Sequence, residues 1–245
     1  MKFGILVFPG SNCDRDVATV TSGLLKQPTR LIWHTDTDIS DCDVIVLPGG
    51  FSYGDYLRCG AIARFAPVMR SLQEHVAKGK YVIGICNGFQ ALIKLGLVPY
   101  GEITGIDKDS STLTYNKIGR HMSCLIKTRI ASVKSPWMAG VQVGDIHTLP
   151  ISHGEGRFIG SDKLIRRLAE RGQIATQYVD FEGKPSMDIN FNPNYSAYAI
   201  EGITSEDGRV FGKMAHSERI GQNLYKNVPG NFDQKIFESG VNYFK

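Results

Sequence analysis

Residues 82–93 read Val-Ile-Gly-Ile-Cys-Asn-Gly-Phe-Gln-Ala-Leu-Ile, and they carry the clearest fold signal in the sequence. The short apolar run over residues 82–85 predicts a buried strand. Apolar residues then recur at helical spacing, which predicts a helix that begins at Cys86. A strand that passes directly into a helix is the repeating unit of a parallel α/β sheet.

The sequence on the amino-terminal side repeats this pattern. Three further strands are predicted there, at residues 3–8, 31–33 and 44–47. One helix, capped by Asp14 or Asp16, is predicted to run to about Lys26. A second helix is predicted to end at Gly79, from apolar residues at helical spacing: Ile62, Phe65, Met69, Leu72 and Val76. This alternation predicts an α/β fold with a doubly wound, mostly parallel sheet.

The second half of the chain is less regular. Strands are predicted at residues 122–130, 146–152 and 210–214, and helices at 163–171 and 232–244. Residues 182–195 are rich in Asn and Pro, which predicts a surface loop. The chain has no internal repeat and no long linker, so we expect a single domain over residues 1–245.

Composition excludes several function classes. The net charge is +4 and there is no long basic run, which argues against nucleic acid as a partner. Neither a signal peptide nor an apolar stretch of membrane-spanning length is present, so we expect no membrane association. The five cysteines show no CxxC spacing, which argues against a disulfide scaffold or a zinc site and favours reduced thiols in the cytoplasm.

The segment Gly84-Ile85-Cys86-Asn87-Gly88 has the G-x-C-x-G form of a nucleophile elbow. Such an elbow places the sulfur at the start of a helix, whose partial positive charge favours the reactive thiolate. The alternative reading is a buried structural cysteine, which is the usual environment of a free Cys.

A thiolate acyl-transfer enzyme also needs a base and a group that orients it. His216-Ser217-Glu218 follows a predicted strand and supplies both, because residues two apart in an extended segment project to the same side. Taken alone, the triplet would be read as a surface loop. His153, in Ser152-His153-Gly154, also follows a predicted strand and is the rival base.

A third requirement is an oxyanion hole, and Pro48-Gly49-Gly50 follows another predicted strand. Glycine lets backbone N–H groups approach a ligand closely. We expect donors from Gly50 and from the N–H of Asn87; the alternative is a simple tight turn. The carboxyl ends of parallel strands meet at one edge, where ligands bind in such sheets.

Together these elements resemble the class I (triad) glutamine amidotransferases. Within that class, the chain is most similar to the glutaminase subunits of phosphoribosylformylglycinamidine synthase, in purine biosynthesis. The triad elbow is common to the class, whereas GGFSYGD and SHGEGR are more particular to these subunits. Four segments carry the resemblance, at residues 9–14, 49–55, 84–90 and 152–157.

The resemblance implies a flavodoxin-like fold and a triad of Cys86, His216 and Glu218. It implies that Gln90 helps to hold the backbone of the substrate glutamine, and that His153 and Gly154 line its pocket. The family pattern ends in His-Pro-Glu, whereas this chain has serine at 217, which lacks the stiffness of proline.

The resemblance also implies a partner. In the family, a separate synthetase subunit uses ATP to activate formylglycinamide ribonucleotide, and ammonia reaches it through a tunnel. We expect ATP and Mg on that partner and neither a cofactor nor a metal on this chain, which has no G-x-x-x-x-G-K-[ST] phosphate loop. A small helper subunit is a further partner that the resemblance leaves open. We expect a free subunit, although a domain of a fused enzyme would read almost the same.

Three rival interpretations remain at this point. The chain is another glutaminase of the same class with a different synthetase, a cysteine hydrolase or stress-response protein with a similar elbow, or a catalytically dead binding subunit. The GGFSYGD segment argues against the first. The His216-Ser217-Glu218 triplet argues against the second, and the intact Cys, His and Glu against the third.

Overall fold

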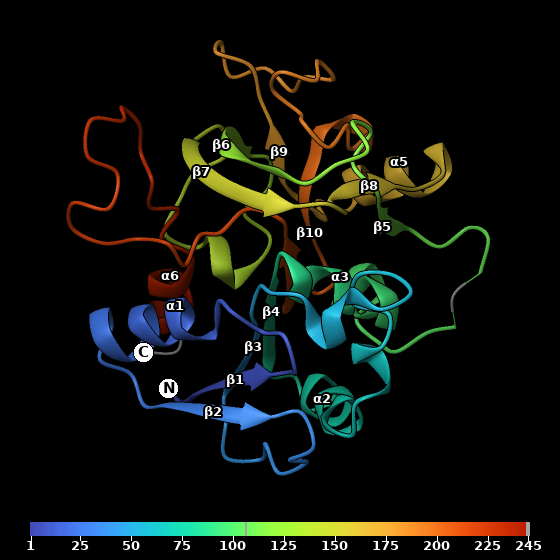
Figure 1. Ribbon diagram of the computed structural model, residues 1–245, viewed down its shortest axis with the longest axis vertical. Helices are drawn as coiled ribbons and strands as arrows, with labels where there is room; N and C mark the ends of the chain where they lie inside the picture. The colour runs from blue at the N-terminus through green and yellow to red at the C-terminus, as the bar shows by residue number, and fades with distance from the viewer. Residues whose placement is uncertain (106, 244–245) are drawn as a thin grey trace.

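The computed structural model describes residues 1–105 and 107–243, which form a mixed sheet flanked by helices (Figure 1). Nine strands are hydrogen-bonded in the order β2-β1-β3-β4-β11-β10-β9-β6-β7, and β5 pairs with β8 separately. The strands are β1 (Phe3–Val7), β2 (Thr29–Trp33), β3 (Val44–Leu47), β4 (Tyr81–Ile85), β5 (Thr112–Thr114), β6 (Met122–Ile130), β7 (Ile146–His153), β8 (Arg157–Ile159), β9 (Ile174–Tyr178), β10 (Ile200–Thr204) and β11 (Val210–Lys213).

The α-helices are short, and α3 and α4 are separated by Gly96 alone. They are α1 (Asp14–Ala18), α2 (Val68–Ala77), α3 (Asn87–Leu95), α4 (Leu97–Tyr100), α5 (Asp162–Glu170) and α6 (Ile236–Tyr243). A π-helical segment at Thr19–Leu24 continues α1. Short 3₁₀ turns lie at Ser52–Asp55, Ala63–Phe65, Pro136–Met138 and Ala197–Ala199.

The first five strands of the sheet are parallel. β1 pairs with β2 and β3, and β4 pairs with β3 and β11, all in parallel register. The order β2-β1-β3-β4-β11 is the flavodoxin-like order, so the predicted α/β fold is confirmed. The loops after β1, β3, β4 and β11 therefore lie at one edge of the sheet, as expected.

Four antiparallel strands extend the sheet beyond β11. β10, β9, β6 and β7 pair successively in antiparallel register. In Figure 1, β6, β7 and β9 lie above the parallel strands. β9 and β10 were not predicted from the sequence, although β10 is completely buried. Its sequence Ile-Glu-Gly-Ile-Thr shows neither a continuous apolar run nor alternation.

The second predicted helix is wrong at its start. Pro67 divides the apolar series, so Ile62 and Phe65 belong to a separate turn and α2 begins only at Val68. The side chain of Phe65 is 73% exposed. Proline removes a backbone donor and disfavours helix in the residue before it. The apolar spacing therefore continues across Pro67, although a single helix does not. Gly79, with φ +76°, follows the helix end as predicted.

Two other segments differ from expectation. The loop at 182–195 has an exposed first part, but Asn192 and Asn194 near its end are fully buried. Asn194 donates to the hydroxyl of Tyr178 at 2.9 Å, which anchors the loop against β9. The last helix starts at Ile236, four residues later than predicted, and its predicted end at Phe244 lies outside the described residues.

Most buried apolar side chains form one cluster that extends from β1 to α6. A smaller cluster lies between the antiparallel strands and includes Ile126, Leu149 and Tyr178. Over residues 1–105 and 107–243, no helix combines the length and the hydropathy that crossing a membrane requires.

Candidate active site

Cys86 lies between β4 and α3 on a sharply bent backbone. Its φ of 53° and ψ of −108° are strained for a residue with a side chain. Two close approaches fix this turn: a Cβ on Gly88 would lie 2.0 Å from the carbonyl oxygen of Leu47, and a Cβ on Gly84 would lie 2.7 Å from the carbonyl carbon of Gly88. The predicted elbow is confirmed, and both glycines are required by contact.

The side chain of Cys86 is buried, and Cys86 is the residue that directly precedes the first turn of α3. Its backbone N–H donates to the carbonyl oxygen of Lys213 at 2.8 Å, so the elbow is pinned to the end of β11. Its Sγ lies 3.5 Å from the carbonyl oxygen of Ser152, at the end of β7. The first N–H groups of a helix have no intrahelical acceptor and carry partial positive charge, which favours an anion at this position.

His216 and Glu218 lie on the loop that follows β11. Nδ1 of His216 is 2.6 Å from Oε1 of Glu218, and both side chains are almost completely buried. The backbone N–H of His216 donates to the carbonyl oxygen of Pro150 at 2.9 Å, which fixes the loop against β7. The expectation that the two side chains face each other is confirmed.

The electrostatics of His216 favour its protonated form. Burial opposes the charge, but the carboxylate of Glu218 and the thiols of Cys86 and Cys13 outweigh it and raise the pKa of His216 well above 6.5. Burial would raise the pKa of Glu218, but the imidazole of His216 overrides it and lowers that pKa. Among the described residues, Nε2 of His216 has no hydrogen-bond partner. This nitrogen is therefore free to exchange a proton with a ligand or with the nearby thiol of Cys86.

His153, the rival base, is in a different environment. Burial, with the charges of His216 and His121, lowers the pKa of His153 to about 3. Its Nδ1 lies 3.1 Å from Oδ1 of Asn116, which also accepts from the N–H of Gly156. Because a carboxamide oxygen only accepts, Nδ1 of His153 carries the hydrogen and the ring is neutral. An acceptor nitrogen, Nε2, remains without a hydrogen-bond partner in the described structure.

The glycine pair after β3 lies beside the histidine. A Cβ on Gly49 would be 2.8 Å from Cε1 of His216 and 2.9 Å from Sγ of Cys13. Gly50 has φ +147°, and a Cβ there would lie 2.7 Å from the carbonyl oxygen of Gly10. The loop after β3 thus comes as close to the catalytic candidates as backbone alone allows. Asn87 supplies the first N–H of α3 on the other side of Cys86.

The side chain of Asn87 connects the elbow to the loop after β3. Its Oδ1 accepts from the N–H of Ser52 at 3.0 Å, and its Nδ2 donates to Oδ1 of Asp55 at 3.0 Å. The same Nδ2 donates to Oε1 of Gln90 at 2.8 Å. Gln90 in turn donates to the carbonyl oxygen of Glu155 at 2.6 Å. Both ends of the Gln90 amide thus have protein partners, so contact with a ligand requires exchange of one of them.

The loop at 152–157 closes this side of the site. The carbonyl oxygen of Gly154 accepts from the N–H of Asn116 at 2.9 Å, and the Asn116 amide donates to the carbonyl oxygen of His153 at 2.8 Å. Nε of Arg58 lies 3.6 Å from Oε2 of the buried Glu155. The structure therefore brings all eight predicted site residues to one edge of the sheet: Cys86, His216, Glu218, Gly50, Asn87, Gln90, His153 and Gly154.

Sequence reasoning missed several side chains at this edge. Cys13 is buried beside His216, and its Sγ lies 3.5 Å from Nη2 of Arg219. Asp55, Asn116 and Glu155 organise the loops around Cys86. Cys13, Asp55 and Glu155 lie in segments that carry the family resemblance, and that was the only signal that could have found them.

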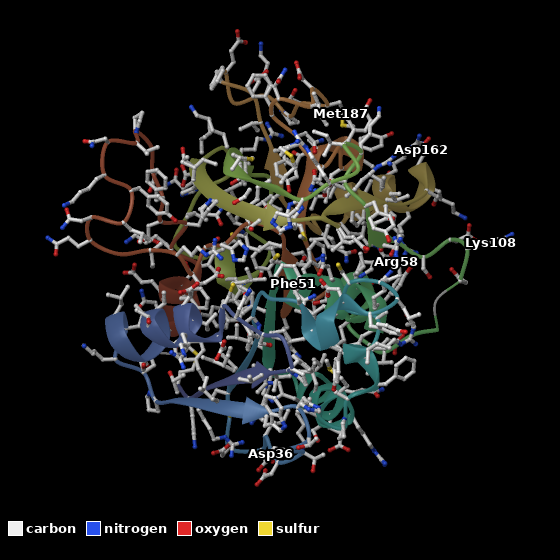
Figure 2. The ribbon with its side chains drawn as sticks, in the orientation of Figure 1. Asp36, Phe51, Arg58, Lys108, Asp162 and Met187 are labelled. Carbon is white, nitrogen blue, oxygen red and sulfur yellow. The ribbon has the colours of Figure 1, made fainter. Side chains whose placement is uncertain are left out.

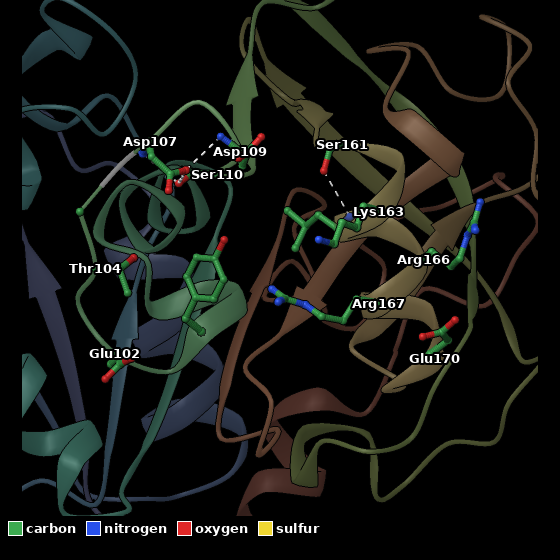
Figure 3. A pocket seen from close by; sticks show the side chains of 13 residues that line it. Glu102, Thr104, Asp107, Asp109, Ser110, Ser161, Lys163, Arg166, Arg167 and Glu170 are labelled. Carbon is green, nitrogen blue, oxygen red and sulfur yellow. Dashed lines mark hydrogen bonds between the residues drawn. The ribbon is translucent and has the colours of Figure 1, made fainter.

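Donor atoms of Cys13, His216 and Glu218 lie within 4.8 Å of one another, a spacing at which a metal ion could be held. However, His216 Nδ1 is already engaged with Glu218, and the Cys13 thiol donates to Asn12 at 3.1 Å. A hollow of about 870 Å³ lies elsewhere, between residues 100–105 and 107–110 on one side and α5 on the other (Figure 3). Its lining mixes acidic and basic side chains, such as Glu102, Asp109 and Arg167.

Comparison with known proteins decides the family. A model of the CobB/CobQ-like glutamine amidotransferase domain matches residues 1–244. The chain belongs to this glutamine amidotransferase family. Among its relatives, phosphoribosylformylglycinamidine synthase subunit PurQ of Synechocystis sp. is 48% identical, over 94% of this chain and 96% of that protein. The protein of the same name from Synechococcus sp. (strain JA-2-3B'a(2-13)) is 49% identical, over 98% and 97%.

Solved structures of glutamine amidotransferases show the same fold. A chain of the structure described as PurLQS from Thermotoga maritima is 31% identical with a TM-score of 0.79, covering 100% of this chain and 99% of that chain. A glutamine amidotransferase from Thermotoga maritima, 15% identical, has a TM-score of 0.51 and covers 89% of this chain and 76% of that one. At that identity, the second likeness concerns the fold alone.

Proposed function

We propose that this chain is the glutaminase subunit of a phosphoribosylformylglycinamidine synthase. It hydrolyses glutamine to glutamate and ammonia, and the ammonia passes to a synthetase subunit. That subunit makes formylglycinamidine ribonucleotide from formylglycinamide ribonucleotide and ATP in de novo purine biosynthesis. One observation carries the activity: Cys86 stands on a strained elbow beside the buried pair of His216 and Glu218. The named relatives, 48% and 49% identical over nearly the whole chain, support the specific role.

The proposed reaction starts with attack by Sγ of Cys86 on the side-chain amide carbon of glutamine. The C–N bond breaks, and His216 donates a proton to the departing nitrogen, which leaves as ammonia. His216 then takes a proton from water, whose oxygen attacks the thioester. The C–S bond breaks and glutamate leaves, which restores the thiolate of Cys86 and the imidazolium of His216.

Glu218 would fix the tautomer of His216 and stabilise the imidazolium, a role that the 2.6 Å separation and the raised pKa of His216 support. The N–H groups of Gly50 and Asn87 would stabilise the oxyanion of both tetrahedral intermediates. Support comes from the position of Gly49-Gly50 against the His216 ring and from the place of Asn87 at the start of α3.

Gln90, His153 and Gly154 would hold the glutamine substrate. His153 suits this role better than that of base, because its ring is neutral and presents an acceptor nitrogen in a buried position. Such an acceptor matches an N–H group of the substrate. Gln90 would contribute by exchanging its bond to Glu155 for one to glutamine.

ATP and Mg would bind to the synthetase partner, and this chain would need neither a metal nor a cofactor of its own. A small helper subunit would complete the assembly. The chain would act as one domain of 245 residues in the cytoplasm, where its five cysteines, all free in the described structure, would stay reduced.

Steady-state assays of glutamate and ribonucleotide product test this function. The purified chain is combined with a phosphoribosylformylglycinamidine synthetase subunit, ATP, Mg and formylglycinamide ribonucleotide, with glutamine as the nitrogen donor. We expect stoichiometric glutamate and amidated product. A different outcome is that this mixture gives glutamate but no amidated ribonucleotide, whereas a mixture with another amidating synthetase gives its amidated product. That outcome would assign the chain to a different partner.

A further inference from the structure

Lys213, the last residue of β11, is a lysine with no exposed surface. Its Nζ donates to the carbonyl oxygen of Ala215 at 2.8 Å and to Oγ of Ser217 at 2.8 Å, and lies 3.4 Å from Oε1 of Glu201. An ammonium group has three N–H donors, and these three oxygens satisfy them. A fully buried cation is tolerated only with such partners, since an unpaired one carries a large desolvation penalty.

Glu201, on β10, is the counter-charge and is buried just as completely. Its Oε1 accepts from the backbone N–H of Ala215 at 2.6 Å, and its other oxygen accepts from the hydroxyl of Thr176. Lys213 and Glu201 therefore hold both the N–H and the C=O of Ala215, the residue directly before His216. No step of the proposed reaction uses either side chain.

Ser217 stands between His216 and Glu218 and joins them to this ion pair. Its hydroxyl accepts from Lys213 and donates to Oε1 of Gln234 at 2.7 Å. Nε2 of Gln234 donates to Oγ1 of Thr128 on β6 at 3.2 Å. All of these side chains are buried. The loop is therefore connected to three strands and to the segment before α6 by hydrogen bonds for which water does not compete.

We infer that Lys213, Glu201 and Ser217 form a polar clamp that positions His216 and Glu218, replacing the stiffness of a proline at 217 with hydrogen bonds. The inference rests on the proposed function of the triad. The three are positioning residues, since each acts through the backbone or side chains of the loop. The clamp also predicts that proline, the residue of the related family pattern, is unfavourable at 217 while Lys213 is present. Proline offers Lys213 no acceptor and cannot donate to Gln234.

Substitutions at Ser217 test the positioning role. We expect Ser217→Ala to lower kcat by about 10-fold or more while the KM for glutamine changes little, because small displacements of reacting groups have large effects on rate. Ser217→Thr retains a hydroxyl and should restore most of that loss. Equal kcat for wild type and Ser217→Ala in the complex would overturn the inference.

A comparison in two backgrounds separates the clamp from a general effect of proline. Ser217→Pro is made in wild type and in the Lys213→Met/Glu201→Gln variant, where no ammonium needs the hydroxyl. We expect the proline to reduce kcat at least 10-fold more in the wild-type background, since residues in one network are strongly coupled. Equal effects in both backgrounds would show that Lys213 and Ser217 do not act together. Lys134→Met, at a lysine bonded on the surface to the carbonyl of Arg171, is the control for the substitution itself.

A measurement that needs no catalytic turnover tests the clamp separately from the proposed glutaminase function. Alkylation of Cys86 by iodoacetamide, measured by peptide mass spectrometry from pH 5 to pH 9, reports how well an imidazolium supports the thiolate. The titratable groups around His216 are Glu218, Cys86, Cys13, His153 and Tyr225, and those around Lys213 are Glu201, Glu218 and His147. Ser217→Ala changes none of them. We expect its alkylation midpoint to move to higher pH, with Ser217→Thr close to wild type. An unchanged midpoint in a Ser217→Ala chain with a wild-type melting curve would refute the positioning role even if the glutaminase assignment holds.

Discussion

Nδ1 of His216 and Oε1 of Glu218 lie 2.6 Å apart in a pair that solvent scarcely reaches. The pair changes the pKa values of both groups in directions that favour charge, raising that of His216 and lowering that of Glu218. Opposite charges attract each other more strongly in a buried site than in water, and this attraction opposes the cost of removing both charges from water. The arrangement therefore links proton affinity, loop geometry and stability.

The first prediction concerns Glu218→Gln. Loss of the carboxylate lowers the pKa of His216, so the imidazolium is less available and kcat should fall by roughly 10²-fold or more. Stability should respond to pH as well. The raised pKa of His216 stabilises the fold below about 6.5 and is lost as pH rises through the folded value; the lowered pKa of Glu218 stabilises it above about 4.5 and is lost as pH falls. The melting temperatures of wild type and Glu218→Gln should differ most between those two pH values. A difference that stays constant from pH 4 to pH 9 would contradict the conclusion that His216 and Glu218 form a charged pair.

The second prediction is that Cys86→Ala abolishes glutamine-dependent synthesis and preserves the fold. The thioester has no substitute nucleophile, and removal of one sulfur from the tip of an elbow leaves little cavity. The complex with this variant should still use added ammonium chloride at the wild-type rate. Glutamine-dependent product above background would exclude Cys86 as the nucleophile.

Third, His216→Ala should lose far more activity than His153→Ala. A general base contributes about 10²–10⁴-fold, and only His216 combines a raised pKa with an orienting carboxylate. His153→Ala should mainly raise the KM for glutamine, because its proposed role is substrate binding. The kinetic parameters of both variants in the complex decide the matter, and a larger loss of kcat in His153→Ala would reverse the two roles.

A fourth prediction addresses the elbow. Gly88→Ala places a Cβ 2.0 Å from the carbonyl oxygen of Leu47, which cannot move without displacing β3. We expect a loss of about 1–3 kcal/mol or more in the free energy of unfolding, measured by urea titration. Gly221→Ala is the control, because a Cβ there meets no described atom within 4 Å. Similar midpoints for both variants would mean that the helix and strand are not in fixed contact.

The fifth prediction is that the isolated chain is a poor glutaminase and that the synthetase subunit activates it. Small displacements of the Gly50 and Asn87 N–H groups would suffice, since an aligned oxyanion donor is worth roughly 10²–10³-fold. Residues 51–58 and 116–120 are the predicted contacts. Phe51 and Arg58 lie near the junction of the two parts of the sheet (Figure 2). Tyr56 and Leu57 are each 72% exposed, whereas Asn116 is buried and acts within the loop network.

Leu57→Ala should therefore reduce activation by the partner without changing the glutamine hydrolysis of the isolated chain. Phe65→Ala is a matched control, because that side chain is 73% exposed and lies outside both segments. Glutamine hydrolysis is measured with and without synthetase, ATP and acceptor. If the wild-type chain hydrolyses glutamine at equal rates in both conditions, activation by the synthetase subunit is ruled out. The chemistry proposed for Cys86 would still stand.

Local patterns predicted the parts of the fold that local physics determines. β3 at Val44–Leu47 and β6 at Met122–Ile130 match their predicted bounds, and β3 is a run of four apolar residues that Pro48 closes. The elbow was predicted because Gly84 and Gly88 mark it in sequence. The eight candidate site residues were predicted from these signals and the family resemblance, which together indicate loops at one edge of a parallel sheet.

The remainder depends on contacts between distant residues. β10 was missed because Glu201 and Gly202 interrupt its apolar pattern, and Glu201 is stable there only because Lys213 faces it from the next strand. The burial of Asn194 in a polar loop depends likewise on Tyr178 and Gly156. A short window of sequence does not show such pairings, because the two residues of each pair lie far apart in the chain and meet only in the folded structure.

The pairing of β4 with β11 affects the order in which the active site forms during synthesis of the chain. These two strands are neighbours in the sheet, yet β4 is translated well before β11. Cys86 therefore leaves the ribosome long before His216, and the growing chain carries an elbow whose base has not been synthesised. The parallel sheet cannot close, and the thiol cannot gain its imidazole, until β11 docks beside β4. Folding thus keeps the nucleophile without its base until β11 and the loop that carries His216 have been made.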